Sequence, residues 1–192
     1  MGKDRLAAFS DGVIAIIITI MVLELHVPHG ADAAALAAAA PSFLSYVLSF
    51  IYVGIYWNNH HHLLHTVTRV DGLILWANLD LLFWLSIIPV ATAWMGQNLG
   101  APLPTAVYGV TLLMPAIAYV LLQWAIIHRH GKQSTLAEAL GSDLKGKLSP
   151  ILYIAGIVLA FVYPWLSVAL YVLVAIIWLV PDQRIERIVG GE

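Results

Sequence analysis

Apolar stretches separated by short polar segments fill most of this 192-residue chain. A helix needs about 20 apolar residues to cross the hydrocarbon core of a bilayer. By this measure the sequence predicts six transmembrane helices, which form a single domain over residues 1–192. The predicted spans are 5–27, 42–65, 71–97, 103–127, 148–163 and 165–181.

Prolines mark the borders of these predicted helices. Pro28 closes the first span, Pro41 precedes the second, and Pro164 forms a tight turn between the last two. Pro89 and Pro115 lie inside the third and fourth spans, where neighbouring helices can accommodate the kinks that we expect.

Two connecting segments are expected to carry short helices of their own. Residues 29–41 are rich in alanine and contain no basic residue, so we expect a short helix at the outer surface. Ser134-Thr135-Leu-Ala-Glu138 has the pattern of a helix-capping box. It predicts a short interfacial helix over residues 135–142 on the cytoplasmic side.

The positive charges indicate how the chain is oriented. Six spans create seven flanking segments that alternate between the two sides, and all nine basic residues fall on one side. They are Lys3, Arg5, Arg69, Arg129, Lys132, Lys145, Lys147, Arg184 and Arg187. Because basic loops stay in the cytoplasm, both termini are predicted to be cytoplasmic.

The composition supports an all-α integral membrane protein. The chain is 61% hydrophobic and 10% charged, whereas a soluble domain is about 25% charged. It contains no cysteine, which excludes disulfides and thiolate metal sites. We expect no signal peptide, because the first apolar run lacks a basic region before it and a cleavage site after it. The basic residues are scattered over short loops, so nucleic-acid binding is not expected.

The first predicted helix has two distinct faces. At about 100° per residue, four residues share one stripe. They are Ile16, Thr19, Ile20 and Leu23. Asp11 and Ser10 are turned away from this stripe, and Glu24 lies near the outer end. An aliphatic stripe also fits packing or lipid contact, but polar groups inside a membrane are costly and mark functional sites. We therefore interpret this helix as one wall of an ion pathway.

Three motifs carry a resemblance to a known family. They are Arg5-x-x-x-Phe9-Ser10-Asp11 at the start of the first helix, Tyr56-Trp57 with histidines behind it, and Trp76-x-Asn78 with Pro89 downstream. This pattern in a six-span chain resembles the transmembrane-protein-175 family of potassium channels. Prokaryotic members of that family have one six-helix unit of about this length.

The resemblance implies a homotetramer in the plasma membrane, with the first helix of each subunit lining a central pore. Ile16 would match the narrow constriction, Thr19 the threonine associated with potassium preference, and Ile20 and Leu23 the hydrophobic wall. Glu24 would lie at the outer mouth. Potassium would pass by passive diffusion, with a modest preference over sodium and without a cofactor. The chain has no Thr-Val-Gly-Tyr-Gly filter, so its selectivity would not be of the ordinary potassium-channel kind. The ring of isoleucines that the resemblance implies can gate by dewetting.

A polar cluster at the cytoplasmic ends of the first three helices is expected to brace the pore helix. Antiparallel neighbours bring these ends to one depth, and a buried Asp11 needs donors. The predicted network draws on Arg5, Phe9, Ser10, Asp11, His60, His61, Trp76 and Asn78. Which histidine of the second helix joins it stays open.

Other functions are weighed against this hypothesis. His61 and His65 have the spacing of two metal ligands on one helical face, but no carboxylate or cysteine repeats nearby at ligand spacing, so no metal site is assigned. The histidines could also sense pH. A coupled transporter could use Asp11, Asp80 and the histidines as a relay, although carriers usually show inverted repeats. The role of Asp80 is open. An enzyme is not expected, because the sequence shows no nucleophile–base pair or metal triad at helical spacing.

Overall fold

The computed structural model describes residues 2–131, 136 and 144–179, and every regular element in these ranges is a helix. The helices are α1 Lys3–Leu23, α2 Ala33–His65, α3 Gly72–Gln97, α4 Pro102–His130, α6 Leu144–Leu159 and α7 Pro164–Leu179. This order confirms the predicted all-α membrane architecture. The helices α1 to α4 are long and apolar enough to cross a membrane, whereas α7 is apolar but has 16 residues.

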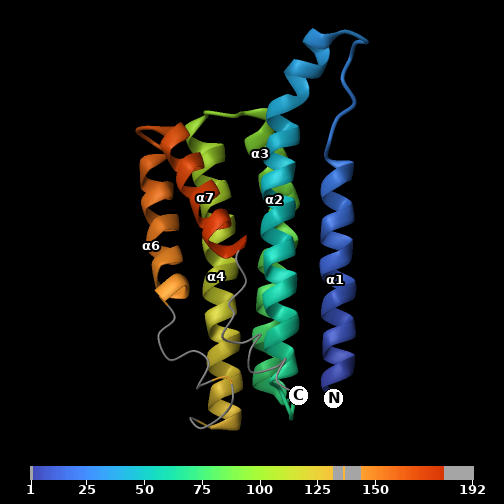
Figure 1. Ribbon diagram of the computed structural model, residues 1–192, viewed down its shortest axis with the longest axis vertical. Helices are drawn as coiled ribbons and strands as arrows, with labels where there is room; N and C mark the ends of the chain where they lie inside the picture. The colour runs from blue at the N-terminus through green and yellow to red at the C-terminus, as the bar shows by residue number, and fades with distance from the viewer. Residues whose placement is uncertain (1, 132–135, 137–143, 180–192) are drawn as a thin grey trace.

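The second helix is longer than the sequence predicted. The alanine-rich segment expected to form a separate surface helix is instead the start of α2, and Figure 1 shows these first turns inclined to the rest. Asp32 caps the helix by accepting a hydrogen bond from Ala35 N at 2.8 Å. Pro41 lies inside α2 without ending it, although an internal proline loses one helical hydrogen bond and crowds the preceding turn. Apart from Leu136, the helix expected over residues 135–142 lies outside the described residues.

Polar contacts join the turn between α2 and α3 to the C-terminal end of α4. Asp71 caps α3 by accepting from Ile74 N at 3.0 Å, and its other oxygen lies 3.3 Å from Arg129 Nε at the end of α4. His130 Nε2 accepts from the backbone N–H groups of Thr68 and Arg69, each at 3.2 Å. The turn between α2 and α3 is therefore held by the last turn of α4.

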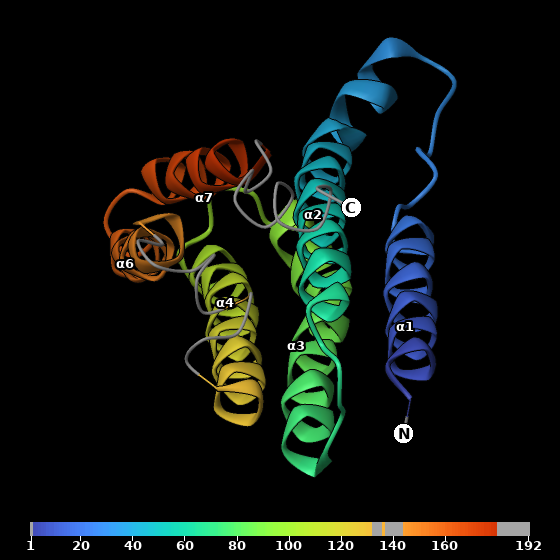
Figure 2. The same ribbon diagram turned by 60° about the horizontal axis from the view of Figure 1, so that its bottom comes forward.

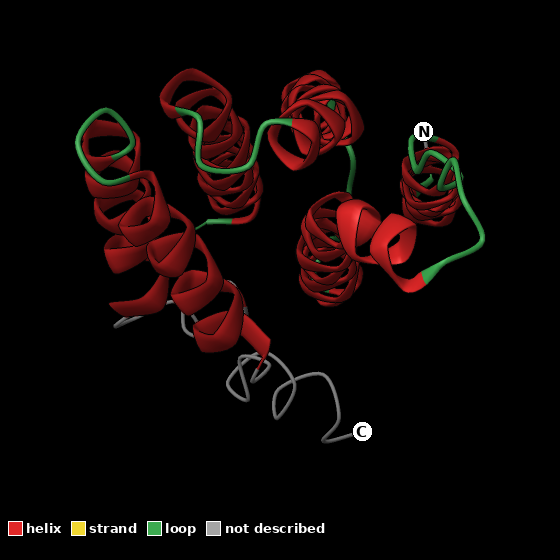
Figure 3. Cartoon of the chain, turned by 90° about the horizontal axis from the view of Figure 1, so that it is seen from above, coloured by secondary structure: helices red, strands yellow, loops and turns green. Residues whose placement is uncertain are grey.

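The helices form a bundle in which α3 and α4 make the most extensive contact. Seen in Figures 1 and 2, α1 lies at one edge of the bundle and α6 with α7 at the other; Figure 3 shows the same order from above. The helix α1 packs against α2 and α3. One whole face of α1 is consequently left open.

Two glycines allow α4, α6 and α7 to approach closely. A Cβ at Gly109 of α4 would collide with the Tyr171 ring of α7 and would lie 2.8 Å from Ile157 Cγ1 of α6. A Cβ at Gly156 would meet Tyr171 Cε1 at 2.5 Å. The fully buried Tyr171 ring thus fills the space that both missing side chains leave.

Candidate functional site

The open face of α1 carries the aliphatic stripe that the sequence predicted. Ile16 is 58% exposed and Leu23 is 80% exposed, and Ile20 lies between them on the same face. Thr19 is exposed too, and its hydroxyl donates to the Ile16 carbonyl at 2.9 Å. Because this bond saturates the threonine's only proton, Thr19 presents its methyl group and oxygen lone pairs rather than a free donor.

The opposite face of α1 holds the helix to its own subunit. The buried residues of this face recur every three or four positions, and all of them except Ser10 join the main hydrophobic core. They are Leu6, Ser10, Ile14, Ile17 and Met21. In a single subunit α1 therefore has one side packed and one side available for ions, lipid or other subunits.

A shallow groove runs beside the stripe between α1 and α3. Its α1 wall includes Ile16, Ile20 and Glu24, and its α3 wall includes Ser86 and Val90. Glu24 is the exposed C-terminal cap residue of α1. The acid predicted for the outer mouth thus lies at the end of the same groove as the predicted constriction.

Behind the stripe, three buried polar side chains connect three helices. Asn78 of α3 donates from Nδ2 to Ser10 Oγ at 3.0 Å, and Ser10 donates to the Leu6 carbonyl at 2.9 Å. His60 Nε2 lies 2.7 Å from Asn78 Oδ1, so Nε2 carries the proton because an amide oxygen only accepts. The carboxamide of Asn78 thereby joins α1, α2 and α3 at one depth.

Asp11 is held by a different tryptophan from the one predicted. Trp57 of α2 donates from Nε1 to Asp11 Oδ1 at 3.0 Å. Trp76 is 74% exposed and points away, because it lies two residues before the buried Asn78 and so about 200° around the helix. Trp57 lies three residues before His60 and therefore on a similar side of α2. This spacing is the sequence signal that could have identified Trp57 as the donor.

The remaining predicted members lie apart from this network. Arg5 and Phe9 are exposed on α1, and within the described residues Arg5 makes no hydrogen bond or ion pair. His61 bonds to His65 rather than to Asn78, with 3.2 Å between their Nε2 atoms. Asp80 lies half-buried on α3, where the described part of the chain offers it no hydrogen bond.

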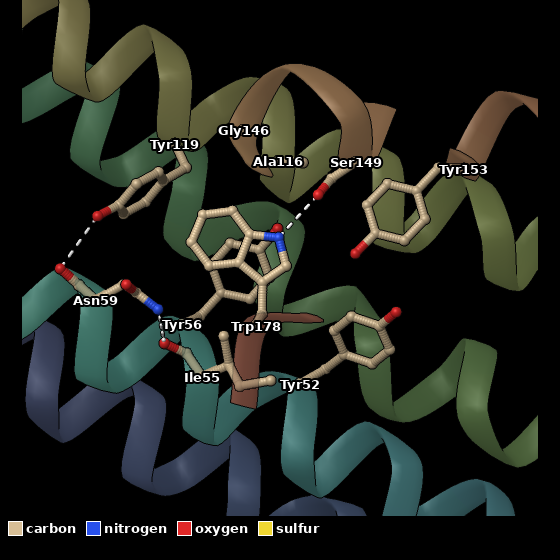
Figure 4. A pocket seen from close by; sticks show the side chains of 10 residues that line it. All are labelled: Tyr52, Ile55, Tyr56, Asn59, Ala116, Tyr119, Gly146, Ser149, Tyr153 and Trp178. Atoms are coloured by element: carbon tan, nitrogen blue, oxygen red, sulfur yellow. Dashed lines mark hydrogen bonds between the residues drawn. The ribbon is translucent and has the colours of Figure 1, made fainter. Parts of the chain in front are cut away.

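A separate cavity of about 40 Å³ lies among α2, α4, α6 and α7, away from the α1 stripe. Figure 4 shows the aromatic rings around it, with Trp178 donating to Ser149 Oγ at 2.8 Å and Tyr119 to the Asn59 carbonyl at 3.1 Å. Ala116 of α4 contributes the smallest side chain to its wall except for Gly146. This volume holds a water or two but not an ion pathway.

Comparison with known proteins relates these features to a family. Residues 5–89, which contain the stripe and the polar network, match the family described as endosomal/lysosomal potassium channel TMEM175. A potassium channel of Chryseobacterium sp. (strain P1-3) is 57% identical over 187 residues, which cover 97% of each chain. A potassium channel of Streptomyces collinus is 32% identical over 91% of this chain and 90% of its own.

A solved structure is similar over almost the whole length. It is the crystal structure of a lysosomal potassium-selective channel TMEM175 homologue from Chamaesiphon minutus. The TM-score is 0.79 at 30% identity, and the match covers 94% of this chain and 97% of that one.

Proposed function

Because the chain belongs to the TMEM175 family of potassium channels, we propose that it conducts potassium ions passively across a membrane through a pore lined by α1. The observation that carries this proposal is the exposed stripe of α1, which is apolar apart from one threonine and lies opposite the face that packs. One such helix cannot enclose a pore, so the stripes of several subunits face one another. Four identical subunits form the assembly, as the resemblance implies.

In this arrangement the Ile16 side chains form the constriction. Ile20 and Leu23 continue an apolar wall, and Thr19 supplies the oxygen atoms of the passage. A ring of branched aliphatic side chains excludes water unless it widens, and therefore gates by dewetting. Potassium is preferred modestly over sodium, because the wall holds no ring of carbonyl ligands.

The polar residues behind the stripe position α1 without touching the ions. Asn78 and Trp57 hold Ser10 and Asp11 from the packed side of the helix. The orientation follows from charge: the described basic residues lie at the start of α1, in the turn after α2, at the end of α4 and at the start of α6. Both termini face the cytoplasm, and the protein resides in the plasma membrane.

The channel names of the relatives favour this function over a coupled transporter that uses Asp11, Asp80 and the histidines of α2. The two mechanisms differ in their kinetics. A channel passes ions down their gradient without coupling, whereas a carrier saturates and requires the coupling ion.

The test is flux of potassium, caesium and sodium through purified protein in liposomes, with Ile16→Asn beside the wild type. We expect potassium flux above sodium flux, and Ile16→Asn to change the conductance or this preference. The matched control is Ile154→Asn on α6, since Ile154 is exposed to a similar extent, at 53% against 58% for Ile16. If Ile16→Asn and Ile154→Asn changed the ion flux equally, Ile16 would not line the pore. Absence of flux unless a proton gradient is present would favour the carrier.

A further inference from the structure

Two exposed histidines on the last turns of α2 converge on one point. His61 and His65 are one turn apart, their ring centroids are 4.6 Å apart at an interplanar angle of 66°, and their Nε2 atoms are separated by 3.2 Å. Neutral imidazole offers one nitrogen lone pair per ring. Both available nitrogens therefore point into the same small volume.

The separation of these nitrogens has the value that a chelated metal requires. Zinc–imidazole bonds of about 2.05 Å that meet at the tetrahedral angle place their nitrogens about 3.3 Å apart. The pair at 3.2 Å is already close to that arrangement. In the metal-free protein one Nε2 donates its proton to the other across this distance, so the lone pair of the donor ring is on its Nδ1. When that proton moves to Nδ1, both Nε2 lone pairs are free for a cation without a change of rotamer.

Two carboxylates and one ammonium group give the surroundings a net negative charge, which the sequence alone did not reveal. The two histidines line a groove between α2 and the first turns of α1, together with Asp4, Asp11 and Lys3. Spacing along α2 gave no carboxylate near the histidines, because both carboxylates come from α1. One Asp11 oxygen accepts from Trp57, which leaves the second oxygen for another partner.

We propose that His61 and His65 form a binding site for a divalent transition-metal cation of the zinc class. Within the described residues no set of three or more ligands is already gathered around one point. The two imidazoles are therefore the direct ligands, and water molecules fill the other positions. Asp4 and Asp11 interact with the cation across the groove through those waters and, with Lys3 beside them, offset part of its charge. A bound cation links the start of α1 to the end of α2.

This proposal does not depend on ion conduction, so its test measures binding. The full chain is purified without a polyhistidine tag, treated with EDTA, dialysed and titrated with zinc chloride in a calorimeter. We expect one zinc per chain. His61→Ala and His65→Ala each weaken binding at least tenfold, because a single surface imidazole is a poor zinc ligand. His128→Ala, an exposed histidine at the end of α4, is the matched control and leaves binding unchanged.

A spectroscopic signature locates the metal independently. The Trp57 ring centroid lies 6.2 Å from that of His61, so a bound copper(II) ion quenches the fluorescence of this indole. Trp57→Phe removes most of the quenching, whereas Trp165→Phe, at the exposed start of α7, does not. Zinc binding by His61→Ala and His65→Ala at the wild-type affinity would overturn the proposal. So would absence of binding by the wild type, which would leave the pair as a hydrogen bond only.

Discussion

The indole of Trp57 on α2 and the carboxylate of Asp11 on α1 are joined by a hydrogen bond of 3.0 Å. This bond fixes the start of α1 from the side that faces away from the proposed pore. We expect Asp11→Ala to reduce the amount of assembled protein or the open fraction while the potassium-to-sodium flux ratio of surviving channels is unchanged. Trp57→Phe removes the same hydrogen bond and has a weaker effect. It lowers the free energy of unfolding by about 1 kcal/mol.

Trp76→Phe is the control for this prediction, since the Trp76 indole is exposed and is absent from the described hydrogen-bond network. It leaves the amount of assembled protein and the potassium-to-sodium flux ratio unchanged. The measurements are size-exclusion profiles in detergent and flux ratios in liposomes. A changed flux ratio in Asp11→Ala would show that Asp11 contacts the ions instead.

Asn78 is expected to contribute more to stability than any exposed polar residue near it. Asn78→Leu removes the donor to Ser10 and the acceptor for His60 at once, and leaves a buried imidazole N–H without a partner. The free energy of unfolding should fall by about 1–3 kcal/mol. Ser10→Ala should have a smaller effect, because it removes one donor and leaves the bond between Asn78 and His60. Thermal unfolding in detergent measures both, and equal midpoints for the two variants would contradict this order.

Cysteine modification tests which face of α1 contacts water. The natural chain contains no cysteine, so each introduced thiol is unique. We expect a charged thiol reagent to modify Ile20→Cys and Leu23→Cys in liposomes and to change potassium flux. Ile17→Cys and Met21→Cys, whose native side chains are buried, should react at least tenfold more slowly. Equal rates on both faces would mean that the stripe faces lipid rather than an aqueous pore.

Gly109→Ala should destabilise the contact among α4, α6 and α7. The added methyl group overlaps the Tyr171 ring and lies 2.8 Å from Ile157 Cγ1, which predicts a loss of about 1–3 kcal/mol. Gly54→Ala is the matched control: nothing lies within 4 Å of its Cβ, so the higher helix propensity of alanine should leave stability equal or slightly greater. Tyr171→Phe should partly rescue Gly109→Ala because it removes the overlapping hydroxyl. Absence of rescue would show that Ile157 carries the strain.

Ala116→Val should fill part of the cavity shown in Figure 4. The cavity is about 40 Å³, and two buried methyl groups stabilise by about 1 kcal/mol where they fit without strain. We therefore expect a higher unfolding midpoint in detergent. A lower midpoint would indicate that ordered water occupies the cavity and is lost on substitution.

The sequence predicted those features that depend on periodicity and length. Ile16, Ile20 and Leu23 recur at helical spacing, so their common face follows from 3.6 residues per turn alone. The structure places this face outward. The order of the six helices in the described residues follows in the same way from apolar length. The limits of α2 were wrong, because a proline and an alanine-rich composition do not determine whether a helix continues through them.

The hydrogen-bond partners could not be predicted, because they depend on how each helix is rotated about its axis. Trp57 and Trp76 are both indole donors near the same depth, and only the packing of α2 and α3 turns the first toward Asp11. Similarly, His60 and His61 are adjacent in sequence but lie about 100° apart, so one bonds to Asn78 and the other to His65. The residues that share one face of a helix can be predicted from the sequence, whereas the contacts between helices can be assigned only from the tertiary structure.

The position of α1 at the edge of the bundle has a consequence for how such a protein can evolve. Its packed face alone anchors it to α2 and α3, so substitutions at Ile16, Thr19 or Leu23 leave the fold of the subunit intact. In the proposed pore, substitutions on this face would therefore be selected by what the assembly conducts rather than by whether each chain folds. Ion preference can therefore diverge among descendants of one scaffold through single substitutions, with little compensating change elsewhere in the chain.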